Sequence, residues 1–385
     1  MKLHRPTWDI FCRVVDNFGD IGVCWRLARQ LANEYPLQVR LWVDDLVPLT
    51  QLCPGATLAP QQQLEQVAIH KWTSPFGSFG APADVIIEAF GCTLPDSYLA
   101  AMKARTTAPL WINLEYLSAE SWIEDCHQML SIHPQLGLKK TFFFPGFTRA
   151  TGGLLREQDL LAEQHSFDDA ARGALLQRLS VTDQGQCLIS LFSYENPAVG
   201  ALLDTWREGA TPITCLIPNG KILSSVNRYL HQCLQPGDSY HDGNLQLVVL
   251  PFLSQTDYDR LLWLCDVNFV RGEDSFVRAQ WAGKPFIWHI YPQEENAHQV
   301  KLTAFLERFN QSADTDVAQS VSRLWQSWNG GESSVEREVG SCAAAWNQCM
   351  KQYPQWLNHC QTWREEQLSA GDLAAKLVEL SQKTL

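Results

Sequence analysis

The stretch WDIFCRVVDNFGDIGVCWRLARQLA, residues 8–32, indicates the class of fold. Residues 8–15 form a short apolar run that is typical of a buried strand. After a short polar loop, one side of an expected helix carries apolar residues, namely Ile21, Cys24, Trp25, Ala28, Leu31 and Ala32. A strand, a tight loop and a helix in this order predict an α/β fold with a parallel sheet.

The same pattern continues in two series along the chain. Further strands are expected at 39–43, 85–89 and 110–114, and, after a polar helix-like stretch at 167–179, at 187–192, 213–217, 245–250, 267–270 and 285–290. A helix is expected at 256–265, and the chain beyond about residue 304 is helical in pattern and rich in Trp. Two α/β series in 385 residues predict two domains, because single cores stop growing at about 250 to 300 residues.

Composition restricts the partners of the chain. It has 42 acidic and 30 basic residues and a formal charge of -12, which opposes nonspecific binding to nucleic acid and favours a basic protein partner. The 12 Cys form no CxxC pair, so they are expected to be reduced thiols. Asp9 and Arg13 interrupt the first apolar run, so we expect no signal or membrane segment there and a cytoplasmic protein.

Two aspartates, Asp16 and Asp20, lie between the first strand and the first helix. Carboxylates at this position can cap the helix, act as a base, bind a cation or remain solvated. For Asp16, a turn residue that accepts hydrogen bonds from loop amides is an equally good interpretation.

The stretch VNFVRGEDSFVRAQWAGKPFIWHIYPQEEN, residues 267–296, predicts a diphosphate site. Its strand ends at RGED, Ser275 can begin a helix, and AGKP ends that helix. Gly272 allows close approach to the backbone, and the free amides of a helix start carry about +0.5 charge. Taken alone, the stretch is also explained by an ordinary capped helix.

Two other strand ends carry aromatic residues. LFSYEN, residues 191–196, contains Phe192 and Tyr194, and LPFLSQ, residues 250–255, contains Phe252. Core packing is the simpler explanation for each ring alone. Together with the phosphate site they favour a nucleotide site, since base stacking on an aromatic ring contributes about 1 to 3 kcal/mol.

A metal site has little support in the sequence. Asp257 and Asp259 form the DxD pattern of metal-dependent GT-A enzymes, but the pattern lies in QTDYDRLLWL, where the exposed first turn of a helix explains both acids. The ten His include no HExxH motif.

Several long strings resemble the elongation factor P arginine rhamnosyltransferases: DNFGDIGVCWRLARQLA, INLEYLSAE, FFFPGF, GGLLRE and RGEDSFVRAQWAGKPFIWHIYPQEENAH. The matches run from residue 10 to residue 298. The resemblance implies a GT-B fold, with two Rossmann-like lobes facing a central cleft. It also implies an inverting transfer of rhamnose from dTDP-β-L-rhamnose to an arginine of elongation factor P, without metal or cofactor.

The resemblance also implies roles for single residues. Asp20 is similar to the family's general base, Asp16 supports it, Gly19 lines the donor, and Glu273 is similar to a second catalytic acid. Asp274 and Ser275 match donor-phosphate contacts, and the nucleoside and diphosphate are held by residues matching Phe192, Tyr194, Phe252, Gln255 and Arg271. A base makes chemical sense, because an arginine with a pKa above about 12 must lose its proton to attack a sugar.

Four segments are expected on this basis. Residues 1–160 form a lobe with the acceptor site and the base, 161–184 connect, 185–365 bind the nucleotide sugar, and 366–385 form a helix that packs back on the first lobe. A nucleotide-sugar epimerase of GT-B-like fold and a noncatalytic protein that binds elongation factor P are the alternatives. The acids Asp16, Asp20 and Glu273 argue against pure binding.

Overall fold

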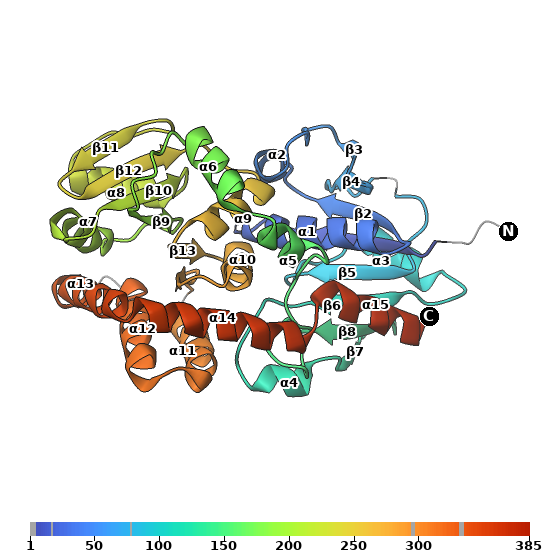
Figure 1. Ribbon diagram of the computed structural model, residues 1–385. Coiled ribbons are helices and arrows are strands. Elements are labelled where there is room, and N and C mark those ends of the chain that lie inside the picture. Colours follow the sequence, from blue (N-terminus) through green and yellow to red (C-terminus); the bar gives the residue numbers. More distant parts are fainter. Residues whose placement is uncertain (1–4, 17, 78, 294–296, 331–334) are drawn as a thin grey trace. The chain divides into compact units, whose positions relative to one another are not determined.

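The chain folds into two compact units, seen in a computed structural model that describes residues 5–16, 18–77, 79–293, 297–330 and 335–385 (Figure 1). Met1–Gln158 and Gln367–Leu385 form the first unit, and Asp159–Glu366 form the second. These boundaries lie within two residues of the expected ones at 160 and 365. Residues 161–184, expected as a connecting segment, belong to the second unit.

The first unit contains an eight-stranded sheet with the order β3-β4-β2-β1-β5-β6-β8-β7. Its strands are β1 (Thr7–Cys12), β2 (Gln38–Val43), β3 (Gln61–Leu64), β4 (Val67–Lys71), β5 (Val85–Ala89), β6 (Leu110–Leu114), β7 (Leu130–Ile132) and β8 (Lys139–Phe143). β1 pairs in parallel with β2 and β5, and β5 pairs in parallel with β6. The carboxyl ends of these four strands therefore lie at one edge of the sheet.

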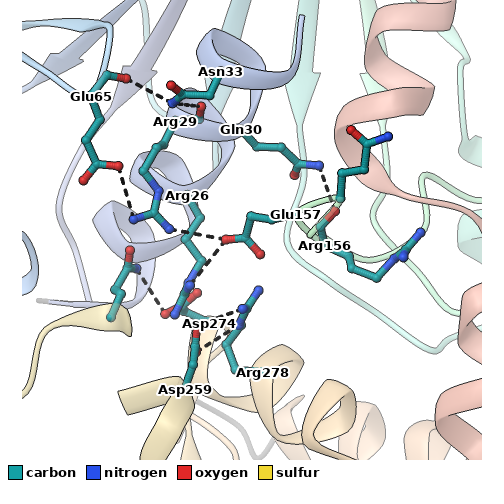
Figure 2. A network of polar contacts seen from close by, with 12 residues as sticks. Arg26, Arg29, Gln30, Asn33, Glu65, Arg156, Glu157, Asp259, Asp274 and Arg278 are labelled. Carbon is teal, nitrogen blue, oxygen red and sulfur yellow. Dashed lines mark hydrogen bonds and ion pairs between the residues drawn. The ribbon is translucent and has the colours of Figure 1, made fainter. Parts of the chain in front are cut away.

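In its described residues the first unit also contains the helices α1 (Gly19–Glu34), α2 (Val47–Leu52), α3 (Asp96–Lys103), α4 (Trp122–Cys126) and α15 (Leu373–Thr384). α1 follows β1 and buries most of its residues, including the apolar stripe expected from the sequence. Its Gln30 donates to the backbone oxygen of Arg156 at 2.8 Å, and Arg29 lies 3.4 Å from Glu157 (Figure 2). These contacts fix the segment after β8 to α1.

Aromatic rings fill much of the core of the first unit. Phe11 stacks on Trp42 at 5.9 Å and meets Tyr98 edge-on at 4.9 Å. Asp9 on β1 is fully buried, and its charge is compensated by Arg40, whose Nη2 lies 2.6 Å from the carboxylate, and by the hydroxyl of Tyr98. A charge buried in a core stays only where such partners exist.

The last residues of the chain lie against the segment that follows β8. The Leu373 amide donates to the Leu154 carbonyl at 3.1 Å. At Gly153, which has a φ of +75°, an added Cβ would lie 2.3 Å from the carbonyl oxygen of Gly371. A glycine is therefore required for the close approach of the two backbones.

The second unit contains a six-stranded sheet with the order β11-β12-β10-β9-β13-β14. Its strands are β9 (Cys187–Leu191), β10 (Ile213–Pro218), β11 (Ser239–Asp242), β12 (Leu245–Leu250), β13 (Val267–Arg271) and β14 (Phe286–His289). All neighbours pair in parallel except β11 and β12. The loops after β9, β10, β12, β13 and β14 therefore leave the same edge.

Helices make up the rest of the second unit. They are α5 (Leu160–His165), α6 (Asp169–Arg178), α7 (Val199–Glu208), α8 (Ile222–Leu230), α9 (Gln255–Leu264), α10 (Asp274–Ala282), α11 (Ala297–Phe309), α12 (Thr315–Trp328), α13 (Val335–Lys351) and α14 (Tyr353–Ala370), whose last four residues are counted with the first unit. The Trp-rich region predicted beyond residue 304 forms part of the core of the second unit. There Phe305 stacks on Trp325 with ring centres 5.5 Å apart, and Trp363 donates a hydrogen bond to Gln280 at 2.8 Å.

No helix in the described part of the chain is long and apolar enough to cross a membrane.

Candidate active site

Asp20 is a buried carboxylate in the first turn of α1. The chain changes direction between the end of β1 at Cys12 and the start of α1 at Gly19, so the first strand ends three residues earlier than expected. The amides of Val15 and Asp16 donate to Asp20 Oδ2 at 2.8 and 2.9 Å. The hydroxyl of Tyr116 donates to Oδ1 at 3.2 Å. The loop after β1 is thus folded around this one carboxylate.

Burial raises the pKa of Asp20 above its ordinary value. The hydrogen bonds from the two amides and from Tyr116 act in the opposite direction, and the nearby charge of Asp16 adds to the increase. Burial makes this carboxylate a better proton acceptor than a solvated one, and the hydrogen bonds fix its orientation.

Asp16 and Gly19 form the tight turn in front of α1. The Gly19 amide donates to the Asp16 carbonyl at 2.6 Å, and a Cβ on Gly19 would lie 2.9 Å from Asp16 Oδ2. A side chain at position 19 would therefore displace the Asp16 carboxylate. Asn17, the remaining polar residue of the DNFGD string, lies outside the described residues.

A second group of predicted residues surrounds the start of α10. β13 ends at Arg271, Gly272 has a φ of +60°, and α10 begins at Asp274, with Glu273 as its N-cap residue. Ser275 Oγ accepts from the Arg271 amide at 3.0 Å and also donates to the Arg271 carbonyl. Gln255, the first residue of α9, donates to Asp274 at 3.2 Å. These hydrogen bonds join the end of β13 to the start of α10, and the start of α10 to the start of α9.

The side chain of Arg271 lies against Phe192 and Tyr194, two aromatic residues in the loop after β9. Its guanidinium carbon is 4.7 Å from the centre of the Phe192 ring and 4.7 Å from that of Tyr194. The side chain of Arg271 is buried, and its Nη1 has no hydrogen-bond partner within the part of the chain that is described. A buried guanidinium nitrogen of this kind can receive an anionic group such as a phosphate.

Four residues around these groups were missed in the sequence. Tyr258 meets Phe192 edge-on at 5.4 Å, and the ammonium of Lys221 lies 5.6 Å from the centre of the Tyr194 ring. His289 lies 2.6 Å from Ser193 Oγ, and burial lowers its pKa to about 3, so its imidazole is neutral. The fourth is Tyr116. Lys221, His289 and Tyr116 could have been found from their positions at strand ends, whereas Tyr258, inside α9, carries no comparable signal.

The eleven predicted site residues fall into two groups. Asp16, Gly19 and Asp20 lie together in the first unit, and the other eight lie in the second. Among the latter, hydrogen bonds or ring contacts join Phe192, Tyr194, Gln255, Arg271, Asp274 and Ser275. Phe252, in the loop after β12, and Glu273 are both half-buried. Residues 294–296 of the longest matched string lie outside the described residues.

The interpretation of Asp259 as an exposed first-turn acid is wrong. Asp257 is indeed in the first turn of α9 and lies 2.7 Å from Arg178. Asp259 is buried and receives two hydrogen bonds from Arg278 on α10, at 3.0 and 2.8 Å (Figure 2). Two residues after Asp257 on the helix, it points to a different side and faces α10 instead of solvent. No group of three or more metal-ligating side chains occurs within the described residues.

The two α/β units, each with polar and aromatic residues at the carboxyl ends of parallel strands, define a GT-B fold. The UDP-GlcNAc 2-epimerase of Neisseria meningitidis, solved with UDP-GlcNAc, shares this fold with a TM-score of 0.55 and 11% identity over 98% of this chain and 100% of that chain. The predicted fold class is therefore confirmed. Fold likeness at this identity does not separate transferases from epimerases.

The chain belongs to the EarP family, described as Elongation-Factor P (EF-P) rhamnosyltransferase, whose model matches residues 8–382. It is 48% identical to the protein-arginine rhamnosyltransferase of Pseudomonas putida over 99% of this chain and 100% of that protein. A solved structure that describes EarP-mediated arginine glycosylation of translation elongation factor EF-P matches with a TM-score of 0.70 and 37% identity, over 99% of this chain and 100% of that chain. The predicted family and the predicted class of enzyme, a glycosyltransferase acting as a protein-arginine rhamnosyltransferase, are confirmed.

Proposed function

We propose that the chain transfers rhamnose from dTDP-β-L-rhamnose to one arginine side chain of translation elongation factor P, with inversion at the anomeric carbon, and thereby activates that factor. The proposal rests on the family and on one observation above all. Asp20 is a buried carboxylate with its two oxygens fixed by hydrogen bonds from Val15, Asp16 and Tyr116.

Asp20 is the proposed general base. Arginine is cationic at neutral pH and has no free lone pair with which to attack a sugar, so a proton must leave the guanidinium as the new N–C bond forms. A carboxylate can first orient the guanidinium through charge-assisted hydrogen bonds and then accept that proton. The sugar-phosphate bond breaks as the N–C bond forms, and dTDP leaves with the electron pair.

Asp16 is proposed to support this step. Its backbone amide donates to Asp20, and Gly19 leaves room for its carboxylate at the turn. A second negative charge near Asp20 also favours the approach of a cationic acceptor and raises the pKa of Asp20. Gly19 is proposed to line the donor, and this role rests on the match of its motif to the family.

The donor is proposed to bind at the carboxyl edge of the second sheet. Phe192, Tyr194 and Phe252 offer rings for the nucleoside, and Arg271 offers a buried guanidinium nitrogen for the diphosphate. Further diphosphate contacts are assigned to Gln255, Asp274, Ser275 and the first amides of α10. The positive end of the α10 dipole stabilises the charge that dTDP gains as it leaves.

Glu273 is proposed as a second catalytic acid, acting at the N-terminus of α10 where the diphosphate is expected. The reaction is proposed to need neither a metal nor a cofactor, because Arg271 and the helix amides can supply the positive charge that metal ions supply elsewhere. We propose a cytoplasmic location, where a translation factor would be met as the acceptor.

Intact mass of elongation factor P, measured after incubation with this chain and dTDP-β-L-rhamnose, tests the proposal. The expected result is the gain of one deoxyhexose, which is lost when the acceptor arginine is replaced by lysine. Donor consumption without a mass gain, with an epimerised nucleotide sugar as the product, would instead support an epimerase. Binding of elongation factor P with no consumption of donor would support a noncatalytic binder.

A further inference from the structure

Phe90 and Tyr116 lie one and two residues after the ends of two neighbouring strands of the first sheet. β5 ends at Ala89 and β6 at Leu114, and the Phe90 amide donates to the Leu114 carbonyl at 2.8 Å. Since β5 also pairs in parallel with β1, these residues emerge at the edge where the loop after β1 carries Asp20. Topology therefore brings together residues that are 96 positions apart in the sequence.

The Tyr116 ring is held against Phe90. Their ring centres are 4.7 Å apart and the planes differ by 20°, which is a stacked arrangement. Phe90 has a φ of +55°, a left-handed conformation that is uncommon for a residue with a bulky side chain. Such a backbone persists only where the surroundings stabilise it, and it often marks a functional site. Here it accompanies the stacking of the Phe90 ring on the Tyr116 ring.

The hydroxyl of Tyr116 contacts the oxygen of Asp20 that the loop amides leave open. Oδ2 accepts from Val15 and Asp16, whereas Oδ1 accepts from Tyr116 at 3.2 Å. Tyr116 is 39% exposed and Asp20 is 2% exposed, so the tyrosine is open to solvent and the aspartate is not. A carboxylate oxygen has two acceptor sites, so Oδ1 can receive an acceptor arginine while it keeps this hydrogen bond.

We propose that Tyr116 is a positioning residue for the transfer reaction, which orients Asp20 Oδ1 toward the guanidinium of the acceptor and sets its basicity. The inference rests on the proposed role of Asp20 as the base. The hydrogen bond favours the ionised carboxylate, which is the form that can take a proton. It also prevents rotation of the side chain, and a correctly oriented base is part of a near-attack geometry.

The titratable groups recorded near Asp20 include Asp16 on the same loop and two buried thiols, Cys12 at the end of β1 and Cys24 on α1. Asp44, after β2, acts on the same thiol Cys12. The pKa of Cys12 is raised well above its ordinary value by its hydrogen bond to Cys24 and by burial, so this thiol stays neutral. This thiol therefore contributes no titration at mildly acidic pH.

Tyr116→Phe tests the inference, because it removes the hydroxyl and keeps the ring that stacks on Phe90. We expect kcat for elongation factor P to fall about tenfold, with the KM of both substrates within about threefold of the wild-type values. The acidic limb of the kcat profile should move to higher pH by roughly half to one pH unit, because the ionised form of Asp20 loses a hydrogen bond. An exclusively structural role for Tyr116 would not move this limb.

Tyr98→Phe is the matched control. It removes a tyrosine hydroxyl that donates to another buried carboxylate of the same unit, that of Asp9. This variant should lose thermal stability but keep the pH profile of the wild-type protein. Thermal unfolding of both variants identifies any effect that comes from folding alone.

Titration of the Asp20 carboxyl in the free protein separates the two proposals. Protein labelled with ¹³C in its Asp side chains, with Asp20→Asn used for assignment, should show a higher pKa for Asp20 in Tyr116→Phe than in wild type. If both this pKa and kcat are unchanged in folded Tyr116→Phe, the inference is wrong and the transferase proposal stands. If wild-type protein fails to modify elongation factor P, the proposed function is wrong, and the titration still decides whether Tyr116 sets the basicity of Asp20.

Discussion

The carboxylate of Asp259 accepts two hydrogen bonds from the guanidinium of Arg278, from Nε at 3.0 Å and from Nη2 at 2.8 Å. Both side chains are almost fully buried, with 3% of Arg278 and 8% of Asp259 exposed. These two hydrogen bonds occupy both carboxylate oxygens of Asp259, which would otherwise complete a DxD metal motif with Asp257. Asp257 in turn lies 2.7 Å from Arg178. The acids of this motif therefore link α9 to α10 and α6.

Activity should survive exhaustive removal of divalent cations. The two acids of the DxD pattern are paired with arginines, and the proposed stabilisation of the leaving diphosphate comes from Arg271 and the α10 amides. Initial rates of transfer, measured with and without chelator in metal-free buffer, check this. Loss of activity that one divalent cation restores would contradict the proposed mechanism and make Asp257 a candidate ligand again.

Donor binding and chemistry should separate within the second unit. Phe252→Ala removes a ring that is expected to contact the nucleoside, so it should weaken the affinity for dTDP-rhamnose by about tenfold. Ser275→Ala removes a hydroxyl from the start of α10 and should also weaken this affinity. Glu273→Gln should keep this affinity and lose transfer. Calorimetry of the three variants measures the affinities. Wild-type affinity in both alanine variants would mean that the nucleotide binds elsewhere.

The free energy of unfolding should decrease as the pH falls below about 6.5. His289 has a pKa of about 3 in the folded chain, mainly because of burial and then because of the charge of Arg271. In the unfolded chain its pKa is about 6.5, so at pH values between the two the unfolded chain binds a proton that the folded chain does not. Denaturant unfolding between pH 8 and pH 4 measures this dependence. The decrease should be smaller in His289→Gln, and an equal decrease in both proteins would assign it to other groups.

The acceptor should be recognised as a folded surface. A net charge of -12 favours encounter with a basic partner, but charge alone cannot select one arginine among many. The folded acceptor domain of elongation factor P should therefore react far faster than a short peptide with the same arginine, because the peptide loses conformational entropy on binding. Initial rates with the two acceptors decide this. Equal kcat/KM values would show that only local sequence is read.

Three strands could be predicted from the sequence to the residue, at 85–89, 110–114 and 245–250. Each has a paired strand on both sides and is almost entirely buried, so each is an apolar run with a single polar residue inside it. The antiparallel edge strands β3 and β11 could not be found in this way. β3 reads QQQL and β11 reads SYHD, and both pair in antiparallel fashion at an exposed edge, where no apolar run is needed.

The site could be predicted only as far as it depends on strand ends. Phe192, Arg271 and Asp20 each follow or end a strand of a parallel sheet, and the carboxyl ends of such strands form the ligand edge. The partners of these residues could not be predicted. Tyr116 reaches Asp20 through the neighbouring ends of three strands, and Asp259 is buried by Arg278, 19 residues later on another helix. Such contacts depend on the tertiary packing and on no local pattern.

Transfer by Asp20→Asn, compared with wild type at saturating dTDP-rhamnose, tests the proton-accepting role of Asp20 most directly. The amide keeps the shape of the side chain and can still accept a hydrogen bond, but it cannot take up the proton of the acceptor arginine. The intact mass of elongation factor P, followed over time, should show a rate of transfer about 10² to 10⁴ times lower than that of wild type, which is the factor that a general base typically contributes. Donor affinity and thermal stability should stay close to wild type. A correctly folded Asp20→Asn that glycosylates elongation factor P at the wild-type rate would contradict the account.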